Sequence, residues 1–107
     1  MRPEEIIEKR FVKKVEELDP NLMCHKFEIH GKKGAPDRIV FMPGGVTFFF
    51  EFKKPGGGSV SRHQEKFIVD LQKLGYMAQV VDSWEEPLQI VMNYLEDLRR
   101  RCNNGSS

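Results

Sequence analysis

Two carboxylates and a lysine lie close together in residues 34–53, and all three are side chains that can take part in phosphate chemistry. If this segment is a β-hairpin that pairs Met42 with Val46, Asp37 faces Glu51 and their Cβ atoms lie about 5 Å apart. Two facing carboxylates repel each other, whereas a divalent cation between them would be a suitable partner for both. The spacing therefore favours a cation site. Lys53 lies on the same strand face as Glu51, because side chains alternate along a strand.

A hairpin is expected because two strand-like runs flank a turn. Residues 37–42 and 46–53 are rich in Val, Ile and Phe, and Pro43-Gly44-Gly45 between them can reverse the chain tightly. Phe49 then shares a strand face with Glu51, whereas the phenylalanines at 48, 50 and 52 point to the other face. The pattern predicts that polar chemistry and apolar burial lie on opposite faces of the strand.

The rest of the chain supplies the elements that would position this hairpin. The patterns predict a helix over 3–18, a strand over 23–29, a helix over 62–74, a strand over 76–81 and a final helix. Capping boxes beginning at Ser61 and Ser83 open the last two helices. A strand, helix, strand sequence implies a right-handed crossover, so residues 76–81 should lie parallel to the Glu51 strand. The expected fold class is α/β with a central mixed four-stranded sheet.

Helical spacing also predicts which side chains face the core and which do not. Glu8 is expected on or beside the buried edge of the first helix, and Glu5 is expected to point elsewhere. As an alternative, Glu8 is an ordinary glutamate at the margin of an apolar stripe. Apolar side chains expected outside the monomer core are Ile6, Val12, Phe41 and Tyr94. The predicted core positions of the helices and the last strand are Ile7, Phe11, Val15, Leu18, Phe67, Ile68, Leu71, Leu74, Met77, Val80, Val81, Leu88, Val91, Met92, Leu95 and Leu98.

Composition narrows the class of protein. The chain has 107 residues, 39% hydrophobic and 31% charged, which predicts one domain over residues 1–102 and a frayed tail over 103–107. It contains no apolar run long enough to cross a bilayer, and no cationic apolar leader precedes the first helix, so a cytoplasmic location is expected. Cys24, His25 and His30 lack the spacing of a four-ligand zinc site.

Positive charge is concentrated around the hairpin. The net charge is only +1, but residues 24–66 carry eight Lys and Arg against four Asp and Glu. We expect a surface that handles phosphate, and the alternative is a solvated charged surface. The candidates for nucleic-acid contact are Lys32, Lys33, Arg38, Lys54 and Arg62.

Four short motifs in this order resemble the VRR-NUC domains of the PD-(D/E)xK nuclease superfamily: Glu8 on a first helix, Gly34-Ala-Pro-Asp37-Arg, Phe50-Glu51-Phe-Lys53 and Ser61-x-x-Gln64. The resemblance covers nearly the whole chain and implies a restriction-endonuclease-like αβββαβα core. It implies that Asp37 and Glu51 bind Mg²⁺ or Mn²⁺ with the Phe52 carbonyl, and that Glu8 assists through water. Lys53 would orient or activate the attacking water, and Gln64 completes the catalytic set.

The resemblance implies a metal-dependent endonuclease that hydrolyses DNA. Stand-alone domains of this kind resemble phage or bacterial homodimers that resolve four-way (Holliday) junctions, acting in the cytoplasm of a bacterial or phage-infected host cell. Two other classes remain open: a non-catalytic nucleic-acid-binding module on the same fold, and a protein-interaction adaptor. The residues also permit simpler roles, because Glu51 and Lys53 could form an exposed ion-pairing row, Asp37 could close a Pro-Asp turn and Gln64 could act only as a helix cap.

Overall fold

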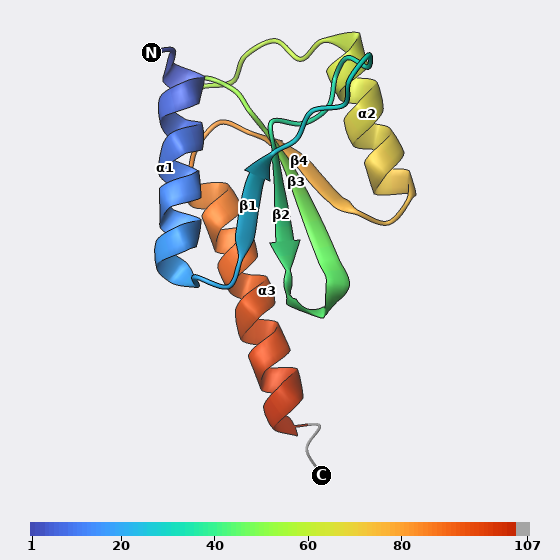
Figure 1. Ribbon diagram of the computed structural model, residues 1–107. Coiled ribbons are helices and arrows are strands. Elements are labelled where there is room, and N and C mark those ends of the chain that lie inside the picture. Colours follow the sequence, from blue (N-terminus) through green and yellow to red (C-terminus); the bar gives the residue numbers. More distant parts are fainter. Residues whose placement is uncertain (105–107) are drawn as a thin grey trace.

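The computed structural model describes residues 1–104, and over these residues three helices surround a four-stranded sheet (Figure 1). A 3₁₀ turn, Pro43–Gly45, joins the second and third strands. The αβββαβα order is the predicted one. In chain order the helices and strands are α1 (Pro3–Leu18), β1 (Met23–Lys26), β2 (Arg38–Met42), β3 (Val46–Phe52), α2 (Arg62–Lys73), β4 (Met77–Val81) and α3 (Glu85–Asn104).

The sheet is mixed, as predicted. Its strand order is β1-β2-β3-β4, with β1, β2 and β3 antiparallel and β4 parallel to β3. Met42 pairs with Val46 and Arg38 pairs with Phe50, so the hairpin register is the predicted one. Gly44 and Gly45 have φ of 82° and 75°, a backbone conformation that makes this tight reversal easy for glycine. Asp37 directly precedes Arg38, and continuing the register places it opposite Glu51.

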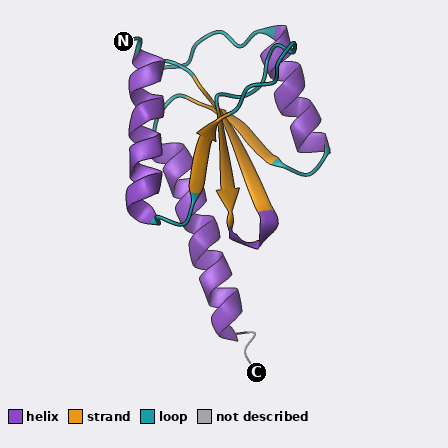
Figure 2. Cartoon of the chain, viewed as in Figure 1, coloured by secondary structure: helices purple, strands orange, loops and turns teal. Residues whose placement is uncertain are grey.

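Helices cover both faces of the sheet (Figure 2): α1 and α3 pack on one face and α2 on the other. On the first face, the ring centroid of Phe11 lies 5.3 Å from that of Phe50 and 5.5 Å from that of Phe52. On the second face, Phe49 is buried with Ile68 and other apolar side chains beneath α2. The predicted separation of polar and apolar faces therefore holds only in part, because α2 buries the Phe49 end of the face that carries Glu51.

Several predicted boundaries and core positions are wrong. β1 ends at Lys26 rather than residue 29, and the Phe27 ring turns beneath α2, with its centroid 5.2 Å from that of Phe49. Val12 and Tyr94 pack against the core, whereas Ile6 and Phe41 are exposed as predicted. Predicted core residues that are exposed lie at a helix end, on an edge strand or on the outer face of α3, where nothing covers them: Leu18, Leu74, Val80 and Met92.

The last helix runs further than the predicted domain end. α3 continues through Asn104, past residue 102, and residues 105–107 of the predicted tail lie outside the described residues. Its C-terminal half extends beyond the β2–β3 hairpin (Figure 1). Among residues 1–104, the helices are too short or too polar to span a bilayer.

Candidate active site

Asp37 is held in place by backbone contacts on both sides. The Phe52 backbone N–H donates to Asp37 Oδ2 at 2.8 Å, and the Phe27 backbone N–H donates to the Asp37 carbonyl at 3.1 Å. The preceding Pro36 is fully buried. The carboxylate is therefore fixed at the start of β2, beside the end of β3.

Gly34 allows the segment before Asp37 to pass against α2. Its φ is 93°, and a Cβ at this position would collide with the backbone carbonyl of His63. A side chain at Gly34 would push the segment that leads to Asp37 away from the start of α2. Close backbone approach at Gly34 thus ties the position of Asp37 to that of α2.

Glu51 is the buried carboxylate of the site. Only 3% of the surface of Glu51 is exposed to solvent. Glu51 Oε2 accepts a hydrogen bond from Gln64 Nε2 at 2.9 Å and lies 3.2 Å from Lys53 Nζ. Glu51 Oε1 is buried and has no hydrogen-bond partner within residues 1–104. A buried carboxylate oxygen without a partner is costly, so this atom calls for a ligand.

Burial is the main cause of a high pKa at Glu51. Burial and then the nearby charge of Asp37 raise the pKa of Glu51 to about 7, although the hydrogen bond with Lys53 acts to lower it. A divalent cation would reverse this balance, because it favours the ionised forms of both acids. The contribution of Asp37 is the one expected when two carboxylates face each other across the hairpin.

Lys53 and Gln64 connect the site to α2. Lys53 Nζ donates to Gln64 Oε1 at 2.9 Å, and the Ser61 backbone N–H donates to the same oxygen at 3.1 Å. Gln64 N in turn donates to Ser61 Oγ at 3.1 Å, which completes the predicted capping box. The Gln64 side chain therefore caps α2 and also bridges Lys53 and Glu51. The two interpretations of Gln64 are compatible.

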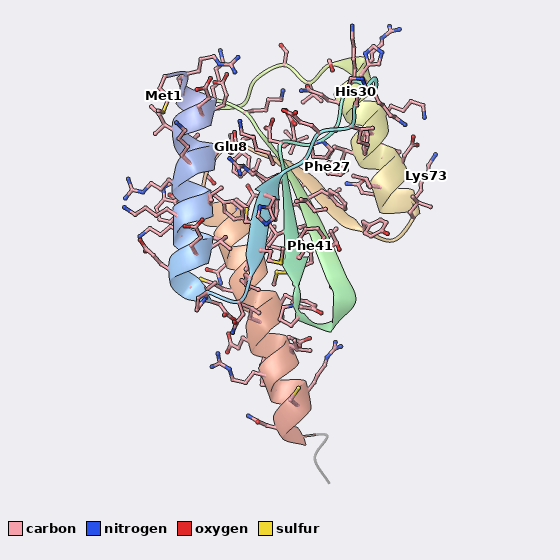
Figure 3. All side chains as sticks on the ribbon, in the orientation of Figure 1. Met1, Glu8, Phe27, His30, Phe41 and Lys73 are labelled. Carbon is pink, nitrogen blue, oxygen red and sulfur yellow. The ribbon has the colours of Figure 1, made fainter. Side chains whose placement is uncertain are left out.

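Glu8 borders the same site but is paired. Arg38 Nε donates to Glu8 Oε2 at 2.6 Å, and the two side chains are 13% and 15% exposed. Figure 3 shows Glu8 on the side of α1 turned towards the sheet. Because Arg38 is engaged in this pair, it is not a free cation for phosphate contact. Glu8 could reach a cation only if it shared its carboxylate with Arg38.

A cleft of about 380 Å³ brings Glu8, Asp37, Glu51, Lys53 and Gln64 together. Phe52 also lines it, and because the Phe52 ring is buried in the core, its contribution to the cleft is its backbone. The other lining residues are Arg2, Glu4, Glu5, Lys54, Gly58 and Ser59. The Gly-rich connector after Lys53 therefore borders the site, as a substrate-facing flap would.

The remaining predicted phosphate contacts do not gather at this cleft. Lys54 lines it, but Lys32 and Lys33 line a separate groove beside α2, and Arg62 lies in a further hollow along α2. Arg2, Glu4 and Glu5 line the cleft although none of them was a predicted site residue, and Glu5 was expected to point elsewhere. The first turn of α1 lies at the mouth of the cleft, so its side chains reach the cleft from more than one face of the helix, as Glu4 and Glu5 do. Arg2 Nε donates to Glu5 Oε1 at 2.6 Å. The i to i+4 spacing of Glu4 and Glu8 could have identified Glu4.

The side chains fit a hard cation with few protein ligands. Over residues 1–104, no group of three or more His, Cys, Asp and Glu side chains is arranged to hold a metal ion. Asp37 and Glu51 supply two carboxylates. Glu51 Oε1, which has no hydrogen-bond partner among the described residues, is the oxygen that a cation would satisfy. Mg²⁺ is commonly held by one or two carboxylates with water completing its shell. The donor set therefore fits a cation of this kind.

Comparisons with known proteins agree with this geometry. No protein-family model matches the chain. The chain is 35% identical over 80 residues to a protein of Acyrthosiphon pisum secondary endosymbiont phage 1 whose name reads "Putative nuclease p44", and the match spans 75% of this chain and 83% of that protein.

Solved structures share the fold. A structure titled "VRR_NUC domain" superposes with a TM-score of 0.76 and 28% identity, covering 88% of this chain and 99% of that one. A "VRR_NUC domain protein" superposes with a TM-score of 0.73 and 17% identity over 90% of each chain, a likeness of fold alone. The phage relative and the shared fold together show that this chain belongs to the VRR-NUC domain family.

Proposed function

We propose that this chain is a metal-dependent endonuclease that hydrolyses phosphodiester bonds of DNA. The observation that carries the proposal is Glu51: a buried acid with one unpartnered oxygen, opposite Asp37 and bonded to Lys53 and Gln64. Asp37 and Glu51 would hold Mg²⁺ or Mn²⁺ together with the Phe52 carbonyl. When bound, such a cation polarises a phosphoryl oxygen and acidifies water.

The side chains around the two carboxylates would each have a defined part. Contacts with Glu51 and Gln64 keep the Lys53 ammonium inside the cleft. There the ammonium can orient a water, or contact a phosphate oxygen as negative charge develops on it. Gln64 fixes the position of that ammonium. Lys54, which lines the same cleft, would contact a neighbouring phosphate. Glu8 would assist through water if Arg38 shares it.

We further propose that the active form is a homodimer that cuts four-way junctions at paired positions. One chain offers one such site, so two symmetric cuts need two chains. Exposed apolar side chains, among them Ile6 at 53% and Phe41 at 43% exposure, provide surface for a second copy. Sedimentation of the protein with and without junction DNA tests this, and a single 12.5 kDa species in both cases would leave nicking of one strand as the activity.

The relative named as a phage nuclease supports a setting in the cytoplasm of a bacterial or phage-infected cell. The nuclease proposal is tested by incubating the protein with duplex, flap and four-way-junction DNA in Mg²⁺, Mn²⁺ or EDTA. We expect cleavage in either metal and none in EDTA, with Glu51→Gln inactive. The matched control is Glu65→Gln, which removes one charge from an exposed position on α2 and should cut normally.

DNA binding that is unaffected by metal, with no cleavage of any substrate, would instead support a non-catalytic nucleic-acid-binding module.

A further inference from the structure

A second hollow lies beside α2 and shares no residue with the active-site cleft. It has a volume of about 670 Å³ and is lined by residues 31–33, by one face of α2 that carries His63 and Phe67, and by Leu74 just after the helix. We call it the α2 groove. His63 borders the groove and the adjacent Gln64 borders the cleft, so the two hollows meet at the first turn of α2. Figure 3 shows His30 beside this turn and Lys73 at the far end of the helix.

The rim of the α2 groove is positively charged. It carries Lys32, Lys33 and Lys66 against a single acid, Asp70, which is already paired with Lys66 at 2.6 Å. Within the described part of the chain, neither Lys32 nor Lys33 forms an ion pair. Two unpaired ammonium groups at the edge of one hollow favour an anionic occupant.

The floor of the groove is apolar and contains an aromatic ring. Leu71 and Leu74 line it beside Phe67, and Leu74 is 75% exposed. Lys32 Nζ lies 5.2 Å from the centroid of the Phe67 ring, and the other ring near Phe67, that of Phe27, meets it edge to face at 6.1 Å. The Phe67 ring is half-buried and packs against the core beneath α2, and the exposed Lys32 side chain lies over the ring. A flat ligand could stack on the Phe67 ring in place of the Lys32 side chain. The Lys32 ammonium would then contact a negative charge of the ligand.

A positive rim over an aromatic floor fits an unpaired nucleic-acid strand. In a duplex the base faces are stacked on one another and only base edges and backbone are accessible, so the Phe67 ring would find no base face to stack on. An unpaired nucleotide offers both a phosphate and a base face, which are the two features that single-strand binders contact. An acidic peptide would meet the lysines but would leave the ring unused.

We propose that the α2 groove binds an unpaired strand of the DNA substrate, with a base stacked on Phe67 and phosphates held by Lys32 and Lys33. This inference rests on the proposed nuclease function, because it assigns a place to the unpaired strand of a branched or frayed substrate next to the catalytic cleft. It implies a preference for DNA that contains unpaired nucleotides over continuous duplex.

The test measures binding without cleavage. Fluorescence anisotropy in EDTA would follow a labelled oligothymidylate about 12 nucleotides long, within the length that one binding domain covers. Phe67→Leu should weaken binding about tenfold, the loss expected for one stacked base, and Phe67→Tyr should retain it. The double variant Lys32→Gln/Lys33→Gln should lower the slope of log affinity against log salt by about 1.4, because each phosphate contact with a single strand contributes about 0.7.

The matched control is Lys13→Gln/Arg100→Gln, which removes two positive charges from exposed sites outside the groove and should bind as the wild type does. Wild-type affinity in Phe67→Leu, or equal weakening of a duplex and of the oligothymidylate by that change, would overturn the proposal. The Lys32 and Lys33 double variant keeps the test decisive if Phe67→Leu disturbs packing, because an unchanged salt slope would also overturn it.

Failure of this proposal can be told from failure of the nuclease proposal. If wild-type protein cuts DNA in Mn²⁺ but the groove variants bind the oligothymidylate normally, only the groove assignment is wrong. If the groove variants lose binding while wild-type protein cuts nothing, the groove does bind unpaired DNA, and it is the nuclease proposal that is wrong.

Discussion

Replacing Glu51 by Gln should change how the stability of the metal-free protein depends on pH. In the unfolded chain this carboxyl ionises near its ordinary pKa of 4.5, whereas in the folded protein burial and Asp37 raise the pKa to about 7. Between these values the folded state holds a proton that the unfolded state has lost. Stability must therefore fall as pH rises through this window, because the folded state binds more protons.

The size of the effect follows from the shift. At 1.36 kcal/mol for each pKa unit, a rise from 4.5 to about 7 corresponds to a loss of about 3 kcal/mol of unfolding free energy between pH 4.5 and about pH 8. Glu51→Gln carries no titrating group at this position. The difference in unfolding free energy between wild type and variant should therefore change by about 3 kcal/mol over the same range.

Urea unfolding in EDTA, followed by the fluorescence of the single tryptophan, Trp84, measures this difference directly. Glu65→Gln controls for the change in net charge. Parallel pH curves for wild type and Glu51→Gln would refute the reasoning, because they would show that Glu51 has the same proton affinity in both states. Added Mn²⁺ should stabilise the wild type most at high pH, where both carboxylates are ionised.

Three further predictions concern the residues that support the two acids. Lys53→Ala should lower the cleavage rate constant by about 100- to 1,000-fold while Mn²⁺ affinity stays close to normal, since its ammonium serves the water or the phosphate; single-turnover kinetics and calorimetry check both. Gln64→Ala and Ser61→Ala should each lower the unfolding free energy measured in urea by about 1 kcal/mol, because each breaks the capping box. Only Gln64→Ala should also slow cleavage strongly, because of the two residues only Gln64 contacts Lys53. Gly34→Ala should lower the unfolding free energy by about 1 to 3 kcal/mol more than Gly56→Ala, because both glycines have positive φ but only the first faces a backbone carbonyl at contact distance; urea unfolding of the two variants compares them.

The hairpin was predictable because its determinants are local. Pro43-Gly44-Gly45 fixes where the chain reverses, and one paired position, Met42 with Val46, then sets every other pair down to the approach of Asp37 to Glu51. The Ser61 capping box is equally local, and it placed the start of α2 correctly. Short-range patterns of this kind need no information about the rest of the molecule.

What could not be predicted depends on contacts between distant segments. Glu8 and Arg38 are 30 residues apart, and nothing in either local pattern indicates that they form a pair. Phe49 alternates with Phe48 and Phe50 and was expected on the polar face, but α2 covers that part of the sheet. The burial of a strand residue depends on which helix packs over it, and this is set by the tertiary structure.

The candidate site shows the same division. Its central acids and lysine follow from one hairpin register, whereas the cleft that surrounds them needs α1, the Gly-rich connector and α2 together. The location of Lys32 and Lys33 also depends on contacts between distant segments. The sequence predicts them near the carboxylates. Because Gly34 lies against the backbone of His63 on α2, the residues just before it line a separate groove beside that helix.

The central claim, that Asp37 and Glu51 form one cation site, is tested most directly by calorimetric titration with Mn²⁺ near pH 8. Wild type and Glu65→Gln should bind the ion with the same affinity, whereas Asp37→Asn and Glu51→Gln should each lose more than about 100-fold, beyond what loss of an outer-shell partner costs. Unchanged Mn²⁺ affinity in both variants would contradict the account.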